Sequence, residues 1–140
     1  MATTSPSLSA DERAAIKARA KELKNEKTQA DQLKLFRAAL DEMPAEERAI
    51  ADRLQAMVAK AAPGLHPKTF YGMPAWANEA DKIICFFQPA TKFKARYNTF
   101  GFEGAAQIDD GGMWSTGFAL VELSTADEKK LAALVAKAAG

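Results

Sequence analysis

The stretch Phe70-Tyr71-Gly72-Met73-Pro74-Ala75-Trp76 separates a helix-patterned half of the chain from a strand-patterned half. It places aromatic side chains around a glycine and a proline, the two residues that most often interrupt regular structure. Proline removes a hydrogen-bond donor from a central strand. We therefore expect Lys68 to Trp76 to form a short strand that bends at Gly72, or an edge strand, whose aromatic side chains turn toward the sheet.

Three helices are predicted before this stretch. Ser9-Ala10-Asp11-Glu12 matches a capping box, which starts a first helix over 10–24. A second helix ends at Met43-Pro44, because the residue before a proline is disfavoured in helical geometry. A third helix over 44–61 has the strongest amphipathic pattern and ends at Pro63-Gly64. The apolar stripe that predicts the second helix consists of Leu33, Phe36, Leu40 and Met43.

Strand patterns dominate the second half. Lys82 to Gln88 is the clearest strand, Lys94 to Phe102 alternates between two faces, Gln107-Ile108 is a brief strand, and Gly117 to Leu123 is the last one. The turns between them are too short for parallel crossovers, so the sheet should be mainly antiparallel. Overlapping capping boxes then begin a helix over 125–138.

This order of elements predicts an α+β fold, with a mainly antiparallel sheet of four or five strands packed by helices. Residues 1–43 form an N-terminal helical extension in this interpretation, and residues 44–140 form the α+β domain.

Both faces of the predicted sheet carry apolar side chains. A sheet with one solvated face should alternate between apolar and polar residues. In the strand over 82–88, however, Ile83, Cys85 and Phe87 point one way, while Ile84 and Phe86 point the other. We expect the second face to be covered by the N-terminal helices, by a second copy of the chain, or by a ligand in an aromatic groove.

Composition excludes several classes of protein. Hydrophobic residues make up 48% and charged residues 26%, with a formal net charge of +1. That balance argues against a protein held on nucleic acid or on a membrane surface by bulk charge. Residues 1–6 have no signal-peptide pattern, and Cys85 is the single cysteine, so no internal disulfide can form. We expect a cytoplasmic location.

A search for catalytic residues favours a binding domain over an enzyme, and it names no catalytic residue and no metal ligand. His66, the single histidine, is interpreted as a loop residue, and Cys85 as a buried, unreactive thiol. No nucleophile elbow, P-loop or dinucleotide-binding motif is present. Acidic residues cluster around the start of the third helix, where carboxylates are common; binding of a hard cation is the alternative. This cluster consists of Asp41, Glu42, Glu46 and Glu47.

An aromatic surface is the leading candidate site. Large aromatic side chains provide contact area, and a few fixed polar groups orient a ligand. The predicted ligand-binding residues are Tyr71, Met73, Trp76, Phe87 and Trp114, with Lys92 and Arg96 as polar anchors.

Several segments together resemble the YdhG/YobT-like domain family of small bacterial proteins. The YGMPAW motif at Tyr71 to Trp76 is the centre of this similarity. The resemblance covers about residues 44–139, and the first helix is similar to an extension that one branch of the family carries. The other segments are PAEERAIADRLQAMVAKAAP, CFFQ, KFKARYNTFGF, and DDGGMW before FALVEL.

The resemblance implies a compact α+β domain with an antiparallel sheet, in a family whose members are mostly uncharacterised. Some relatives are described as frataxin-like iron chaperones, so the resemblance implies iron as a cargo or cofactor. Three functions therefore stay open: a domain that binds a small ligand or partner through the aromatic surface, an iron-binding protein that uses the acidic cluster, and a homodimeric interaction module.

Overall fold

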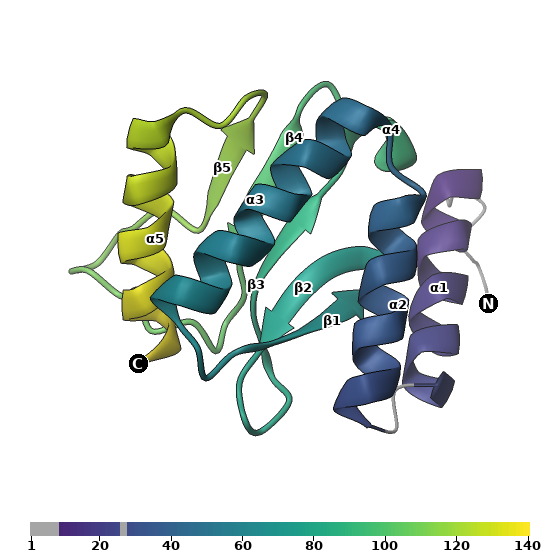
Figure 1. The fold of residues 1–140 in the computed structure, drawn as a ribbon, viewed down its shortest axis with the longest axis horizontal. Helices are drawn as coiled ribbons and strands as arrows, with labels where there is room; N and C mark the ends of the chain where they lie inside the picture. The colour runs from purple at the N-terminus through teal and green to yellow at the C-terminus, as the bar shows by residue number, and fades with distance from the viewer. Residues whose placement is uncertain (1–8, 26–27) are drawn as a thin grey trace.

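The computed structural model of the chain describes residues 9–25 and 28–140; the residues searched for a targeting signal lie outside this range. Figure 1 shows one sheet with α2, α3 and α5 on the viewer's side and α1 beside α2. The elements are α1 (Ala10–Asn25), α2 (Gln29–Asp41), α3 (Ala45–Ala61), β1 (His66–Phe70), β2 (Met73–Ala77), β3 (Ile83–Gln88), α4 (Ala90–Phe93), β4 (Asn98–Phe102), β5 (Gly117–Leu120) and α5 (Thr125–Ala139). The α+β prediction is confirmed.

The helices begin where side chains satisfy their first amides. At α1 the Ser9 hydroxyl accepts from the Glu12 amide at 3.0 Å, and the Glu12 carboxylate accepts from the Ser9 amide at 3.2 Å. This is the predicted capping box. Thr28 caps α2, and Ser124 caps α5. None of the helices in the described ranges is long and apolar enough to cross a membrane.

The five strands follow one another in the sheet in the order β1 to β5, and every neighbouring pair is antiparallel. The stretch from Lys68 to Trp76 is not one bent or edge strand, as the sequence led us to expect. It is a hairpin, in which Phe70 at the end of β1 pairs with Met73 at the start of β2. Pro74 is tolerated in an inner strand because the pairing of β2 with β3 begins at Ala75, so Pro74 lies beyond that ladder.

The core lies between the sheet and the helices on one face. Trp76, the fourth residue of β2, is 1% exposed. Its indole ring lies 5.7 Å from the ring of Phe36 in α2, in an edge-on arrangement, and 6.2 Å from the ring of Phe100 in β4. Leu54 of α3 and Val135 of α5 belong to the same cluster of buried side chains.

The second face of the sheet is less apolar than predicted. A register shift between Trp76 and Ala77 interrupts the alternation, and Ile84 joins the core cluster together with its neighbour Cys85. Phe86 stays half-buried on the second face, where its ring covers Gly101. The N-terminal helix α2 packs on the core face. Whether a second copy of the chain covers the other face stays a prediction.

Three predicted strands are shorter than expected or absent. The strand predicted over 117–123 ends at Leu120. The strand over 94–102 begins only at Asn98, because residues 90–93 form the short helix α4. The Asn98 side chain fixes this corner, since it accepts from the Ala90 amide and donates to the Leu120 carbonyl, both at 2.8 Å. Gln107-Ile108 is not a strand, although Ile108 is buried in the core.

Candidate functional site

The tip of the β1–β2 hairpin is a two-residue turn. Tyr71 and Gly72 have φ angles of 54° and 80°, and positive φ at both central residues is the mark of a type I′ turn. Glycine adopts this conformation readily, whereas tyrosine does so at a cost. A side chain at position 72 would also meet Lys92, whose Nζ lies 2.7 Å from where a Cβ would be. The turn therefore favours glycine for its conformation, and a larger residue would also have to displace the Lys92 ammonium.

The turn is held by Glu22 from α1. The Glu22 carboxylate accepts from the Tyr71 amide at 2.8 Å and from the Gly72 amide at 2.9 Å, and Glu22 is only 4% exposed. Arg19, one helical turn earlier, lies over the rings of Phe70 and Tyr71, 5.4 and 5.9 Å from their centroids. Hydrogen bonds to an ionised acceptor are stronger than neutral ones, so these contacts position α1 against the hairpin.

Lys92 of α4 approaches the same turn from the other side. Its Nζ donates to the Gly72 carbonyl at 3.2 Å and to the Glu42 carboxylate at 3.4 Å. An ammonium group has three N–H donors, so one is left for a further acceptor. The contact with Glu42 is partly solvent-exposed and long, and such pairs contribute little stability. An incoming anion can therefore compete for Lys92 at low cost.

Two cavities meet at Lys92. The first, of about 200 Å³, lies between α1, α2 and the hairpin; the second, of about 190 Å³, lies between α2 and α4. Ala39, Glu42 and Lys92 line both, so we call the pair the hairpin groove. The first cavity is otherwise lined by Ala18, Lys21, Glu22, Leu35, Ala38, Thr69 and Gly72.

A buried hydroxyl lacks a partner in the first cavity. Thr69 is 3% exposed, and its Oγ1 makes no hydrogen bond in the part of the chain that the structure describes. Leaving a buried hydroxyl unsatisfied costs free energy, so such groups usually have partners. Thr69 and Lys92 line the same cavity, beside an apolar wall of alanine and leucine, so the buried Thr69 hydroxyl and the Lys92 ammonium are the hydrogen-bond donors closest at hand for a ligand there.

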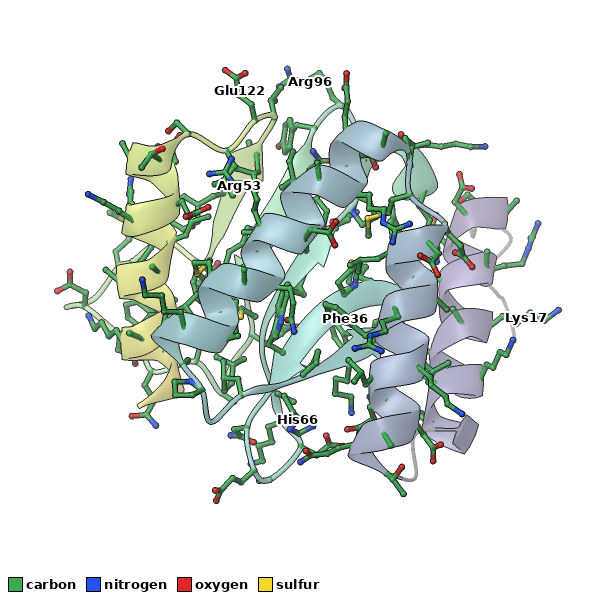
Figure 2. All side chains as sticks on the ribbon, viewed as in Figure 1. Lys17, Phe36, Arg53, His66, Arg96 and Glu122 are labelled. Carbon is green, nitrogen blue, oxygen red and sulfur yellow. The ribbon has the colours of Figure 1, made fainter. Side chains whose placement is uncertain are left out.

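A separate polar cluster holds the other end of β1. Asp81, in the turn between β2 and β3, contacts His66 Nε2 and Lys68 Nζ, each at 2.9 Å, and Gln32 of α2 donates to it at 3.1 Å. Burial raises the pKa of Asp81, but the hydrogen bonds from Lys68 and His66, the Lys68 charge and Gln32 together lower that pKa below its usual value. Figure 2 labels His66 near this turn. The single histidine is the first residue of β1 and a partner of Asp81, so its assignment to a loop was wrong.

The structure does not bring the predicted aromatic residues together in one pocket. Met73, Trp76 and Phe87 are buried, at 7%, 1% and 0% exposure, and the latter two belong to the hydrophobic core. Tyr71 at the hairpin tip and Trp114 in the loop before β5 are exposed. The three buried side chains therefore do not offer contact area to a ligand.

The two predicted polar anchors have different surroundings. Lys92 lines both cavities of the hairpin groove, as described above. Arg96 is exposed and lies over the ring of Tyr97, 5.1 Å from its centroid; Figure 2 shows it at the edge of the molecule. A ligand role for the exposed residues Tyr71, Arg96 and Trp114 stays a prediction.

Two of the four residues of the predicted acidic cluster form ion pairs in the described part of the chain, and a third accepts hydrogen bonds. Asp41 pairs with Arg48 at 2.9 Å, and Glu42 with Lys92. Glu47 accepts from the Thr91 amide at 3.3 Å and from the Thr91 hydroxyl. Within residues 9–25 and 28–140 no three histidine, cysteine or acidic side chains are grouped to hold a metal ion. Iron binding stays an untested expectation of the resemblance.

Glu22 and Thr69 did not stand out in the sequence. Glu22 lies in a helix with few apolar residues, so in the sequence it looks like one of the solvent-exposed acids of that helix. Its partners are amides about 50 positions later in the chain, and no local pattern indicates them. Thr69 fits any β-strand. The available signal was indirect: a YG pair between two β-like segments is compatible with a hairpin turn.

Comparisons with known proteins found no match: no family model, no curated protein and no solved structure is similar to this chain. The site is therefore interpreted from its own geometry.

Proposed function

We propose that this chain is a binding domain for a small organic acid, which occupies the hairpin groove. The observation that carries the proposal is Thr69, which lines the same cavity as Lys92 and whose buried hydroxyl has no partner in the described part of the chain. A carboxylate that entered this cavity would accept from both groups. It would supply the missing partner of Thr69 and the third acceptor for Lys92.

The shape of the cavity supports an acid with a short apolar body. Ala18, Leu35, Ala38 and Ala39 form the wall between the helices. The volume of about 200 Å³ is below the usual range for drug-sized ligands, which favours a molecule with few atoms. Lys21 and Lys92 offset the charges of the Glu22 and Glu42 carboxylates, which also line the cavity. Glu22 does not compete for the donors, because its carboxylate already accepts from the hairpin amides.

Calorimetric titration of the full chain with hexanoate tests the proposal, with 1-hexanol as the uncharged control of the same length. We expect hexanoate to bind and hexanol to bind at least tenfold more weakly, which corresponds to about 1.4 kcal/mol. Lys92→Met should weaken hexanoate binding by a similar factor, whereas Lys94→Met, whose side chain does not line either cavity, should leave it unchanged. Equal affinity for hexanoate and hexanol would contradict a carboxylate site.

Thr69→Val gives a second and sharper test. Valine has a similar shape but no hydroxyl, so the substitution removes an unsatisfied buried group from the free protein. We expect the free protein to be stabilised, by roughly 0.5–1 kcal/mol in denaturant unfolding, while hexanoate binding weakens by about fivefold. A hydroxyl that serves only local structure would instead lower the stability when it is removed.

The similarity to the YdhG/YobT-like family is compatible with this proposal, because that family is mostly uncharacterised. A small-molecule ligand and a cytoplasmic location are both part of the proposal. Iron transfer, and closure of the second sheet face by a homodimer, are the alternatives to this proposal.

A further inference from the structure

A second cavity lies between α2 and α3, away from the hairpin groove, and has a volume of about 320 Å³. Figure 2 labels Phe36 in the space between these two helices. The apolar part of its lining comes from Leu33, Phe36 and Leu40 on α2. These side chains lie on one face of the helix at spacings of three and four residues. The remaining lining residues are Arg37, Asp41, Arg48, Asp52 and Gln55.

The orientation of Gln55 is set by Trp76. An indole N–H can only donate, and Trp76 Nε1 lies 2.6 Å from Gln55 Oε1. The carbonyl oxygen of Gln55 is therefore used by the core, and its amide nitrogen is left with two donors. No acceptor for that nitrogen is present among residues 9–25 and 28–140. Gln55 thus links the buried indole to the cavity, and its free donors are available to a ligand.

The charged groups of the cavity are balanced, with two arginines and two aspartates. Arg48 and Asp41 form an exposed ion pair at 2.9 Å. Arg37 and Asp52 have no ionic partner within the described part of the chain. A simple anion would be attracted by Arg37 and repelled by Asp52. A simple cation would be attracted by Asp52 and repelled by Arg37. A ligand that carries both charges satisfies both side chains.

We propose that this cavity binds a free apolar α-amino acid. Its carboxylate would accept from Arg37 and from the Gln55 amide, and its ammonium group would donate to Asp52. Its apolar side chain would pack against Phe36, Leu33 and Leu40, because these form the uncharged wall. This site shares no lining residue with the hairpin groove, so it does not depend on the organic-acid proposal.

Trp76 supplies a built-in reporter. Because its indole donates to Gln55 at the cavity, a ligand that recruits the Gln55 amide should change Trp76 emission. Trp114 is the second tryptophan and is exposed, so the measurement uses the full chain with Trp114→Phe. The probe is L-phenylalanine. Two matched controls remove one charge each: 3-phenylpropionate lacks the ammonium group, and phenethylamine lacks the carboxylate.

We expect L-phenylalanine to change the emission saturably, and both controls to bind at least tenfold more weakly, since each leaves a charged side chain without its partner. Arg37→Gln and Asp52→Asn should each weaken L-phenylalanine binding by about tenfold. Lys34→Gln changes a cation of the same helix outside the lining and should have no effect, and neither should Lys92→Met in the hairpin groove.

Three results would overturn the inference. Absence of saturable binding of L-phenylalanine would remove the site. Equal binding of 3-phenylpropionate would reject a ligand with two charges. Unchanged affinity in both Arg37→Gln and Asp52→Asn, in proteins whose unfolding midpoint is unaltered, would show that L-phenylalanine binds elsewhere.

Discussion

Replacing Glu22 with alanine should release the N-terminal helix from the hairpin. In the folded protein the carboxylate receives two amide hydrogen bonds, at 2.8 and 2.9 Å, and Glu22 is 4% exposed. A hydrogen bond to a charged group contributes roughly 1.5–3 kcal/mol, so two give an upper bound of about 3–6 kcal/mol. Once α1 moves away, water hydrogen-bonds to the two amides and restores part of this free energy. We therefore expect a loss of about 2–4 kcal/mol in the docking of α1.

Few other contacts oppose this release. Ile16 and Leu23, the larger apolar residues of α1, are 51% and 59% exposed, so little apolar area holds the helix in place. The ion pair of Asp11 with Lys94 is solvent-exposed, and such a pair contributes little. The hairpin below should stay folded, because β1 remains paired with β2 along its length.

Hydrogen exchange of the Tyr71 and Gly72 amides measures the effect directly. A loss of 2–4 kcal/mol corresponds to roughly 30- to 1000-fold faster exchange at these two amides. Glu22→Gln should fall between the wild type and Glu22→Ala, because one carbonyl oxygen replaces two carboxylate oxygens. Glu122→Ala is the control, since this exposed acid, labelled in Figure 2, lies in the connection between β5 and α5.

A change of less than about twofold in the exchange of both amides in Glu22→Ala, which is below 0.5 kcal/mol, would contradict this role of Glu22. That result would mean that the contacts of Arg19 and α2 hold α1 without the carboxylate. Loss of protection from hydrogen exchange across the whole sheet would also contradict it, because Glu22 would then stabilise the whole fold and not only the docking of α1.

Three further predictions concern the body of the fold. The pKa of Asp81 is lowered in the folded protein, so its contribution to stability is present above its ordinary pKa of 3.8 and is lost as the pH falls through the lower folded value. Asp81→Asn should therefore flatten the acid side of a curve of stability against pH. A curve identical to that of the wild type would count against the cluster with Lys68 and His66. Burial raises the pKa of the Cys85 thiol well above its ordinary value, so a thiol reagent should label Cys85 only in denaturant; rapid labelling of the native protein would contradict its place in the core. Gly101→Ala should destabilise the protein by about 1–3 kcal/mol in urea unfolding, because the new Cβ would lie 2.4 Å from the Phe86 ring, and Gly104→Ala, which meets no atom within 4 Å, is the matched control.

Local signals in the sequence predicted most of the helices and the fold class. The capping box at Ser9, the apolar stripe of α2 and the proline-bounded α3 depend on neighbours within a few residues, and the structure confirms each of them. The short turns between strand patterns were enough to predict an antiparallel sheet.

The hairpin could not be recognised for a physical reason. Tyr71 occupies a left-handed position that usually takes asparagine, aspartate or glycine, so the YG pair lacks the usual composition of a type I′ turn. The contact that compensates comes from Glu22, far away in the sequence. The outward direction of Ile84 was also mistaken, because a register shift is a property of the paired strands and not of one strand alone.

The candidate site was predictable only in part. Lys92 was named as a polar anchor from its place beside aromatic residues, and it does line the groove. Of the predicted aromatic residues, Trp76 and Phe87 lie in the core, because strand patterns that suit a ligand surface suit a buried sheet equally well. Tyr71 and Trp114 are exposed. Thr69 is a candidate ligand residue only because it lines a cavity that three separate segments enclose. No short sequence motif predicts such a cavity.

The central claim is that the hairpin groove holds the apolar chain of an acid against α1 and α2, with Thr69 and Lys92 at its carboxylate. Methyl NMR of the full chain saturated with hexanoate tests it most directly. The account predicts intermolecular contacts from the hexanoate methylenes to the methyl groups of Thr69, Ala18 and Leu35, and their loss in Lys92→Met. Contacts confined to the exposed residues Met113 and Val121 would contradict it.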